Sequence, residues 1–166
     1  MSARAANTLG LLVCAALLAY AYYAQFVMHL EPCPLCIFQR LGLFAVGVVF
    51  ALAALHEPAG WGRRVYAALI GLAALATAAV AGRHLYVQSL PPGSVPACGA
   101  SLDFMLKVFP LTDVLVKVLT GSGECAKITW RFLGLSMPGW VLIAALALGA
   151  WGLWANLRRR PPVLRF

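Results

Sequence analysis

Four long apolar runs determine what this chain can fold into. They cover residues 8–28, 37–55, 65–82 and 138–157. A helix needs about 20 mostly apolar residues to cross the hydrocarbon core of a bilayer, and each run is close to that length. Hydrophobic residues make up 63% of the 166 residues and charged residues only 11%, far from the balance of soluble domains. We therefore predict an all-α membrane protein, a four-transmembrane-helix bundle that forms a single membrane domain over residues 1–166.

The first run has a second interpretation, as a cleavable signal peptide. Arg4, an apolar stretch and the small-residue pattern from Ala19 to Ala21 are typical of such a segment. The apolar run nevertheless continues past that point to Met28, which is longer than the core of a typical signal peptide. We expect this segment to be retained as the first transmembrane helix.

Basic residues predict the orientation of the bundle. If both termini are cytoplasmic, seven basic residues lie on that side, close to the ends of the runs: Arg4, Arg63, Arg64, Arg158, Arg159, Arg160 and Arg165. The other side has six, most of them along the loop over residues 83–136. Positive residues near span ends favour the cytoplasm, so we predict a multi-pass protein with both termini inside. The net charge of +8 is then a topology signal, and no aromatic and basic surface indicates a nucleic-acid partner.

Four of the five cysteines favour the same orientation. They fall in the two loops, 29–36 and 83–136, that the charges assign to the exterior. These cysteines are Cys33, Cys36, Cys98 and Cys125. Disulfides persist in oxidising compartments, whereas cytosolic thiols are kept reduced. The fifth, Cys14, lies inside the first run, where a thiol behaves as a small hydrophobic group.

The stretch LEPCPLCIFQR contains a C-x-x-C pair at the membrane boundary. Pro34 suits the first turn of a helix, which puts Cys36 in the first turn of the second span. The backbone N–H groups and the positive end of the helix dipole there favour the thiolate form of Cys36. Arg40, one turn further on, adds a positive charge. A thiolate beside the bilayer can meet a lipid-soluble oxidant, although a structural disulfide between Cys33 and Cys36 fits the same spacing.

The second external loop contains the other two cysteines. Cys98 and Cys125 lie in stretches rich in proline and glycine, which indicates a mobile and accessible pair. Between them, PLTDVLVKVL predicts a short amphipathic helix at the membrane interface, and a helix that caps the bundle would give the same pattern. Its apolar face would carry Leu111, Val114, Leu115 and Val118, opposite Asp113 and Lys117.

Taken together, these features resemble the DsbB family of disulfide bond formation proteins. The resemblance rests on the order of the four spans, CPLCIFQR at the head of the second, and a histidine at the end of the third. A long loop with two cysteines follows, and CAKITWRFLGLSMPGW leads into the fourth span. The similarity runs over nearly the whole chain and is far more specific than a lone C-x-x-C.

The resemblance implies a function and a set of site residues. In this family the loop pair, here Cys98 and Cys125, accepts electrons from a DsbA-like periplasmic thiol oxidase, with Cys98 as the attacked position. Cys125 is then implied to exchange with Cys33. The residues implied to bind ubiquinone or menaquinone are Cys36, Arg40 and His84. The protein would thus be a quinone-dependent protein-disulfide oxidoreductase of the bacterial inner membrane, with its redox loops in the periplasm.

Three other classes of function would account for parts of the sequence. A structural membrane protein with two staple disulfides would show no exchange with a partner. A haem anchor could use His29 and His84, but it leaves four cysteines unexplained. A zinc site of four cysteines usually brings two C-x-x-C knuckles, and the chain has one, so we expect no metal. Covalent haem attachment is excluded because Ile37, not histidine, follows Cys36.

Overall fold

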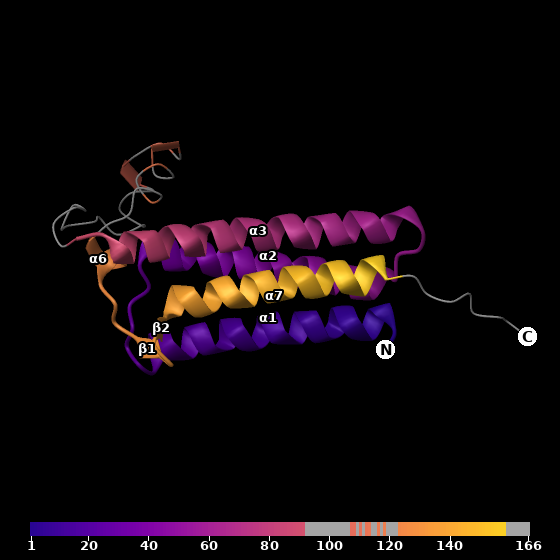
Figure 1. The fold of residues 1–166 in the computed structure, drawn as a ribbon, viewed down its shortest axis with the longest axis horizontal. Coiled ribbons are helices and arrows are strands. Elements are labelled where there is room, and N and C mark those ends of the chain that lie inside the picture. Colours follow the sequence, from indigo (N-terminus) through magenta and orange to yellow (C-terminus); the bar gives the residue numbers. More distant parts are fainter. Residues whose placement is uncertain are drawn as a thin grey trace, which may run out of the picture.

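The computed structural model describes residues 1–91 and 123–158, together with residues 107, 108, 110, 112, 113, 116 and 118. Within this part of the chain lie four helices that are long and apolar enough to cross a membrane. They are α1 (Ala3–Phe26), α2 (Pro34–His56), α3 (Trp61–Ser89) and α7 (Met137–Leu157). The four run side by side, with the N-terminus and the end of α7 at the same end of the bundle (Figure 1). The predicted four-helix membrane fold is confirmed.

The helices begin and end where the sequence supplies suitable caps. The hydroxyl of Ser2 accepts a hydrogen bond from the backbone N–H of Ala5 at 3.0 Å and caps α1. Cys33 is the N-cap of α2, and Pro34 is its first residue, a position where proline costs no hydrogen bond. Glu57 takes the left-handed conformation with φ 43° and ends α2.

Helix α3 continues to Ser89, beyond the expected end of the third span at residue 82. Its last turns contain polar residues, which end the apolar run but not the helix. Residues 83–90 contain no proline, and the next one is Pro91, so the backbone can keep its helical hydrogen bonds. As a consequence, His84 is held on a helix and not in a loop.

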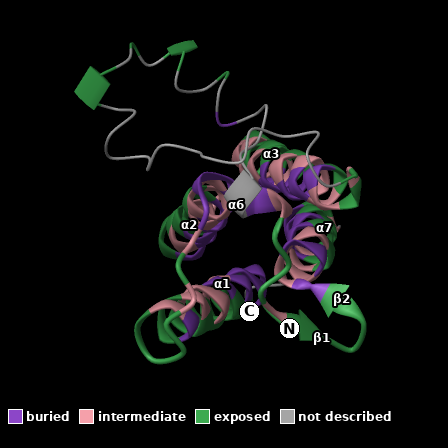
Figure 2. Cartoon of the chain, turned by 90° about the vertical axis from the view of Figure 1, so that its left-hand side faces the viewer, coloured by how far each residue is buried: buried purple, intermediate pink, exposed green. Residues whose placement is uncertain are grey.

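Close packing of small residues holds the bundle together. Viewed along its axis, buried residues face inward and exposed residues lie outside (Figure 2). The core contains Cys14, Leu43, Val46, Phe50, Ile70, Ala74 and Leu148. At Gly10 of α1, a Cβ atom would lie 2.7 Å from the ring of Phe50, so only glycine allows this approach of α1 to α2. Such contacts are typical of membrane helices, whose association depends on close van der Waals packing.

A pair of buried amides joins α1 to α7 at the end of the bundle that carries the N-terminus. Asn7 donates to the side-chain oxygen of Asn156 at 3.2 Å, and Asn156 donates back to Asn7 at 3.0 Å. Close by, the indole N–H of Trp151 donates to the carbonyl of Ala6 at 2.9 Å. These bonds satisfy polar groups that would be costly to leave unpaired inside the bundle.

Short elements cover the opposite end of the bundle. They are α6 (Gly123–Ala126) and an antiparallel hairpin of β1 (Arg131–Phe132) and β2 (Leu135–Ser136). In Figure 1, α6 lies at the end of α3 and the hairpin lies near the start of α7. The hydroxyl of Ser136 donates to Gln88 of α3 at 2.7 Å and fixes the hairpin to the bundle.

The amphipathic helix expected between Leu111 and Val118 lies mostly outside the described residues and stays a prediction. Val118, which is described, is buried beside Cys33, Val87 and Cys125.

Candidate active site

Two sulfurs meet at the start of α2. The thiol of Cys33, the N-cap residue, donates to the sulfur of Cys36 across 3.1 Å, so this pair is a dithiol. The backbone N–H of Cys36 points at the sulfur of Cys33 over 3.4 Å. Because the first turn of a helix has unpaired N–H groups and the positive end of the dipole, negative charge on these sulfurs is stabilised here. The sequence-predicted pair therefore has the geometry of a reactive dithiol.

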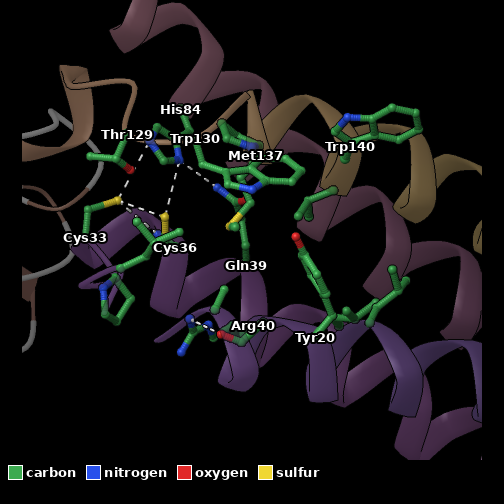
Figure 3. A pocket seen from close by; sticks show the side chains of 18 of the residues that line it. Tyr20, Cys33, Cys36, Gln39, Arg40, His84, Thr129, Trp130, Met137 and Trp140 are labelled. Carbon is green, nitrogen blue, oxygen red and sulfur yellow. Dashed lines mark hydrogen bonds between the residues drawn. The ribbon is translucent and has the colours of Figure 1, made fainter. Parts of the chain in front are cut away.

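His84 of α3 lies against both sulfurs. Its side chain is only 2% exposed, and its Nε2 atom is 3.7 Å from the sulfur of Cys33. The Nδ1 atom is 4.0 Å from the sulfur of Cys36. Nε2 also lies 3.1 Å from the carbonyl oxygen of Cys125, to which its N–H donates. The extension of α3 past the expected span makes these contacts possible, because it carries the imidazole to the level of the dithiol (Figure 3).

Gln39 is a site residue that the sequence analysis missed. It is 3% exposed, and its amide nitrogen lies 3.0 Å from Nδ1 of His84. With Nε2 of His84 donating to Cys125, Nδ1 accepts from the amide of Gln39, which fixes one neutral tautomer. A signal was present in the sequence: Gln39 is polar within an apolar span and follows Cys36 by three residues, on the same helical face.

Cys125 joins the site from α6. The sulfurs of Cys33 and Cys125 and a ring nitrogen of His84 all lie within 4.8 Å of one another, and all three residues are buried. The structure thus brings together Cys33, Cys36, His84 and Cys125, which come from three segments far apart in sequence. Cys98, the remaining predicted cysteine, lies outside the described residues.

The surroundings of Cys33 keep this thiol protonated. Hydrogen bonds with Cys125 and Cys36, together with burial, raise the pKa of Cys33 far above the ordinary thiol range. Since the Cys33 thiol donates its hydrogen towards Cys36, the negative charge of the pair is favoured on Cys36.

The sequence analysis predicted that the charge of Arg40 lies beside Cys36, but in the structure its side chain contacts α1. Its guanidinium donates to the side-chain oxygen of Gln25 and, at 3.0 Å, to the carbonyl of Ala21, both on α1. It also lies over the ring of Tyr22, 5.3 Å from the ring centre. Among the described residues no hydrogen bond joins Arg40 to either sulfur, and Figure 3 shows the guanidinium away from His84. The carbonyls near the C-terminal end of α1 attract this cation because that end of a helix is negative.

A cavity of about 390 Å³ begins at the dithiol and extends between the helices. Cys36, Gln39, Arg40 and His84 line it near the dithiol. Apolar side chains of α1 and α7 form other walls, among them Leu17, Leu18 and Ile143, and aromatic residues line it at Tyr20, Trp130 and Trp140. This combination of apolar walls with a few polar groups is typical of a site for a small, mostly apolar molecule.

Comparison with known proteins gives a consistent family. The family model described as "Disulfide bond formation protein DsbB" matches residues 3–155. A relative from Nitrosococcus oceani, named disulfide bond formation protein B, is 53% identical over 154 residues, which cover 93% of this chain and 91% of the relative. A relative of the same name from Methylococcus capsulatus is 54% identical over 160 residues, covering 95% of this chain and 98% of the relative. A third, from Marinobacter nauticus, is 54% identical over 151 residues.

Proposed function

Because this chain belongs to the DsbB family of disulfide bond formation proteins, we propose that it reoxidises a DsbA-like periplasmic thiol oxidase and passes the electrons to a membrane quinone. The observation that carries the proposal is the cluster of three sulfurs around His84, because Cys33, Cys36 and His84 also line the cavity. Electrons that reach Cys125 have a short route through the dithiol to a molecule in that cavity.

The first half of the reaction is thiol–disulfide exchange with the partner. A thiolate of the partner attacks the sulfur of Cys98 in a Cys98–Cys125 disulfide, and the thiolate of Cys125 leaves. The second thiol of the partner then attacks the mixed disulfide, so that the partner gains a disulfide and Cys98 is released as a thiol. Two electrons and two protons pass from the partner to the loop pair in this exchange. The roles of Cys98 and Cys125 in it come from the family.

The second half moves the electrons to the start of α2. The thiolate of Cys125 attacks Cys33 in a Cys33–Cys36 disulfide, and Cys36 leaves as a thiolate. Its sulfur lies in the first turn of α2, where the helix dipole stabilises a negative charge. It is also 4.0 Å from Nδ1 of His84, which would add to this effect once that nitrogen takes up a proton. Cys98 then attacks Cys125, which reforms the loop disulfide and releases Cys33 as a thiol. The raised pKa of Cys33 keeps this thiol protonated, so the negative charge of the reduced pair stays on Cys36. The reduced pair would return to the Cys33–Cys36 disulfide as it gives two electrons to a molecule in the cavity, with the thiolate of Cys36 as the electron donor.

The size and lining of the cavity support a quinone as its ligand. Its volume of about 390 Å³ lies within the range of roughly 300–1,000 Å³ for small-molecule sites. A quinone bound there would accept two electrons and two protons. We propose that Cys36, Arg40 and His84 hold it, together with Gln39. The guanidinium has five N–H donors and uses two on α1, so others remain to donate to a carbonyl oxygen. His84 is near enough to Cys36 to hold or supply a proton.

The proposed orientation puts this chemistry in the periplasm. The cysteine cluster and α6 are at one end of the bundle, and the N-terminus and the end of α7 are at the other (Figure 1). Arg4, Arg63 and Arg158 lie at that second end, which supports a cytoplasmic location under the positive-inside rule. We propose the bacterial inner membrane, with both termini cytoplasmic.

A turnover assay tests this function. The purified chain in detergent is mixed with ubiquinone or menaquinone and a reduced DsbA, and quinone absorbance is followed. We expect continuous quinone loss that stops in the Cys36→Ser variant, while Cys14→Ala turns over normally. A wild-type protein that folds but turns over neither quinone would favour the structural role with staple disulfides.

A further inference from the structure

We propose that the fully reduced protein binds one Zn²⁺ through Cys33, Cys36, Cys125 and His84. In the sequence, the single C-x-x-C does not by itself indicate a zinc site. In the folded chain, however, α3 brings a histidine and α6 brings a third cysteine to the C-x-x-C pair at the start of α2. Three cysteines and one histidine are a common ligand set of zinc sites. The inference concerns the reduced thiols and does not depend on the electron transfer proposed above.

The ligand atoms already have nearly the right separations. In a tetrahedral site with Zn–S of about 2.3 Å and Zn–N of about 2.0–2.1 Å, neighbouring ligand atoms lie roughly 3.5–3.8 Å apart. The sulfurs of Cys33 and Cys36 are 3.1 Å apart, and Nε2 of His84 is 3.7 Å from the sulfur of Cys33. The atoms of Cys33, Cys125 and His84 lie within 4.8 Å of one another. These three ligand atoms can therefore meet at one ion. Cys36, whose sulfur is 3.1 Å from that of Cys33, would turn towards the same ion and complete the set.

Burial gives this cluster a reason to take up a cation. Cys33, Cys125 and His84 are 8%, 1% and 2% exposed. Several thiolates in such a place repel one another and are poorly solvated, so the reduced cluster must either keep its protons or gain a positive charge. Zn²⁺ replaces the thiol protons, and the start of α2 stabilises the remaining negative charge. All four ligands come from the protein, as in closed, structural zinc sites.

Gln39 is suited to support the histidine ligand. Nε2 of His84 faces Cys33 and Cys125, so this nitrogen would bind the ion in place of its bond to the carbonyl of Cys125. The ring proton must then move to Nδ1, which needs an acceptor. Gln39 lies 3.0 Å away, and its amide can present the oxygen when it turns over. A partner of this kind fixes the tautomer and direction of a zinc-bound histidine, which makes Gln39 a positioning residue.

The expected consequence is a reversible block of the site. Zinc would hold the sulfurs of Cys33, Cys36 and Cys125 at once, so none of them could attack a disulfide or form one. A chelator would release them. Zn²⁺ would thus compete with oxidation of the reduced protein.

Metal binding to the purified full-length chain tests the proposal without any activity measurement. The protein is reduced with a phosphine, desalted without air and titrated with Co²⁺, a coloured substitute for Zn²⁺. We expect one Co²⁺ per chain, a sulfur-to-metal charge-transfer band, the strong visible bands of a tetrahedral ion, and loss of all of these on adding Zn²⁺. The oxidised protein is the control and should give no such spectrum. A reduced wild-type chain without the charge-transfer band would overturn the proposal.

Variants identify the ligands, with zinc affinity measured against a coloured chelator. Cys125→Ser and His84→Ala should each lower the affinity by at least about a hundredfold, and Gln39→Leu by about ten- to a hundredfold, as for other residues that support a ligand. Cys98→Ser and Cys14→Ala should leave the affinity unchanged. A site lost in Cys98→Ser but kept in His84→Ala would be one of four cysteines and would refute this ligand set.

The two proposals fail separately. A chain that turns over quinone but binds no zinc refutes only the zinc site. A chain that binds zinc but does not turn over quinone refutes only the proposed function.

Discussion

Replacing Gln39 by leucine should slow the transfer of electrons to quinone. The amide of Gln39 donates to Nδ1 of His84 at 3.0 Å, and this same nitrogen lies 4.0 Å from the sulfur of Cys36. Leucine has a similar size but cannot donate, so the buried ring loses a partner and the constraint on its tautomer. A buried polar group without its partner costs about 1–3 kcal/mol, which corresponds to roughly a five- to 150-fold slower step.

The assay must separate the two halves of the reaction. Stopped-flow mixing with reduced DsbA gives the rate of partner oxidation, and quinone absorbance gives the rate of the second step. We expect Gln39→Leu to slow only the second, because the proposed exchange with the partner takes place at Cys98 and Cys125.

A matched control is Thr77→Val, which removes another buried polar group from the same bundle. Thr77 of α3 donates to the carbonyl of Ala73 at 2.8 Å and has no hydrogen bond to His84 within the described residues. This variant should keep both rates. If Gln39→Leu slows both steps equally, or leaves the quinone step unchanged, the assigned role of Gln39 is wrong.

Four further predictions concern Arg40 and the cysteines. Arg40→Ala should raise the KM for quinone roughly ten- to a hundredfold by removing a charge-assisted hydrogen bond of about 1.5–3 kcal/mol, with little effect on partner exchange; unchanged quinone kinetics would remove Arg40 from the site. Mixed with the oxidised partner, Cys125→Ser should trap a mixed disulfide, visible on a non-reducing gel, because Cys98 attacks the partner's disulfide and no resolving thiol is left in the loop; Cys98→Ser should trap none, and the reverse result would exchange their roles. Hydrogen bonds and burial raise the pKa of Cys33, so this thiol should stay protonated as the pH rises through the ordinary thiol pKa of about 8.5. Mass spectrometry should therefore find little alkylation of Cys33 up to about pH 9. Early alkylation there would contradict the environment described for it. Cys14→Ala should keep full turnover and lose about 1 kcal/mol of unfolding free energy, while a lost quinone signal in a folded protein would bring Cys14 into the electron path.

Much of the fold could be predicted from the sequence because membrane helices leave a strong signal. An apolar run of the right length has few alternatives in a bilayer, where every backbone polar group must be satisfied. The end of α3 was the main difference, since hydrophobicity marks the apolar core of a span and does not detect a helix that continues through polar residues. His84 and Gln88 both lie in that continuation.

The site was only partly predictable. The C-x-x-C pair at a helix start indicated a reactive dithiol, because its chemistry depends on local structure that Pro34 already signals. The direction of Arg40 depends instead on acceptors on α1, and the contact of Gln39 with His84 depends on how α2 packs against α3. Such contacts between distant segments leave no trace in spacing alone. The proximity of Cys125 to Cys33 was expected only through the family resemblance, and the structure brings the two together.

The most direct test of the central claim is the stoichiometry of a single turnover. The purified chain, carrying bound quinone, is mixed without oxygen with an excess of reduced DsbA. The loss of quinone and the disulfide formed in the partner are then counted in the same sample. Because both are two-electron changes, the account predicts one partner disulfide per quinone reduced, after subtracting the disulfides that the chain itself passes on. Partner oxidation that ends with the chain's own disulfides while the quinone stays oxidised would contradict it.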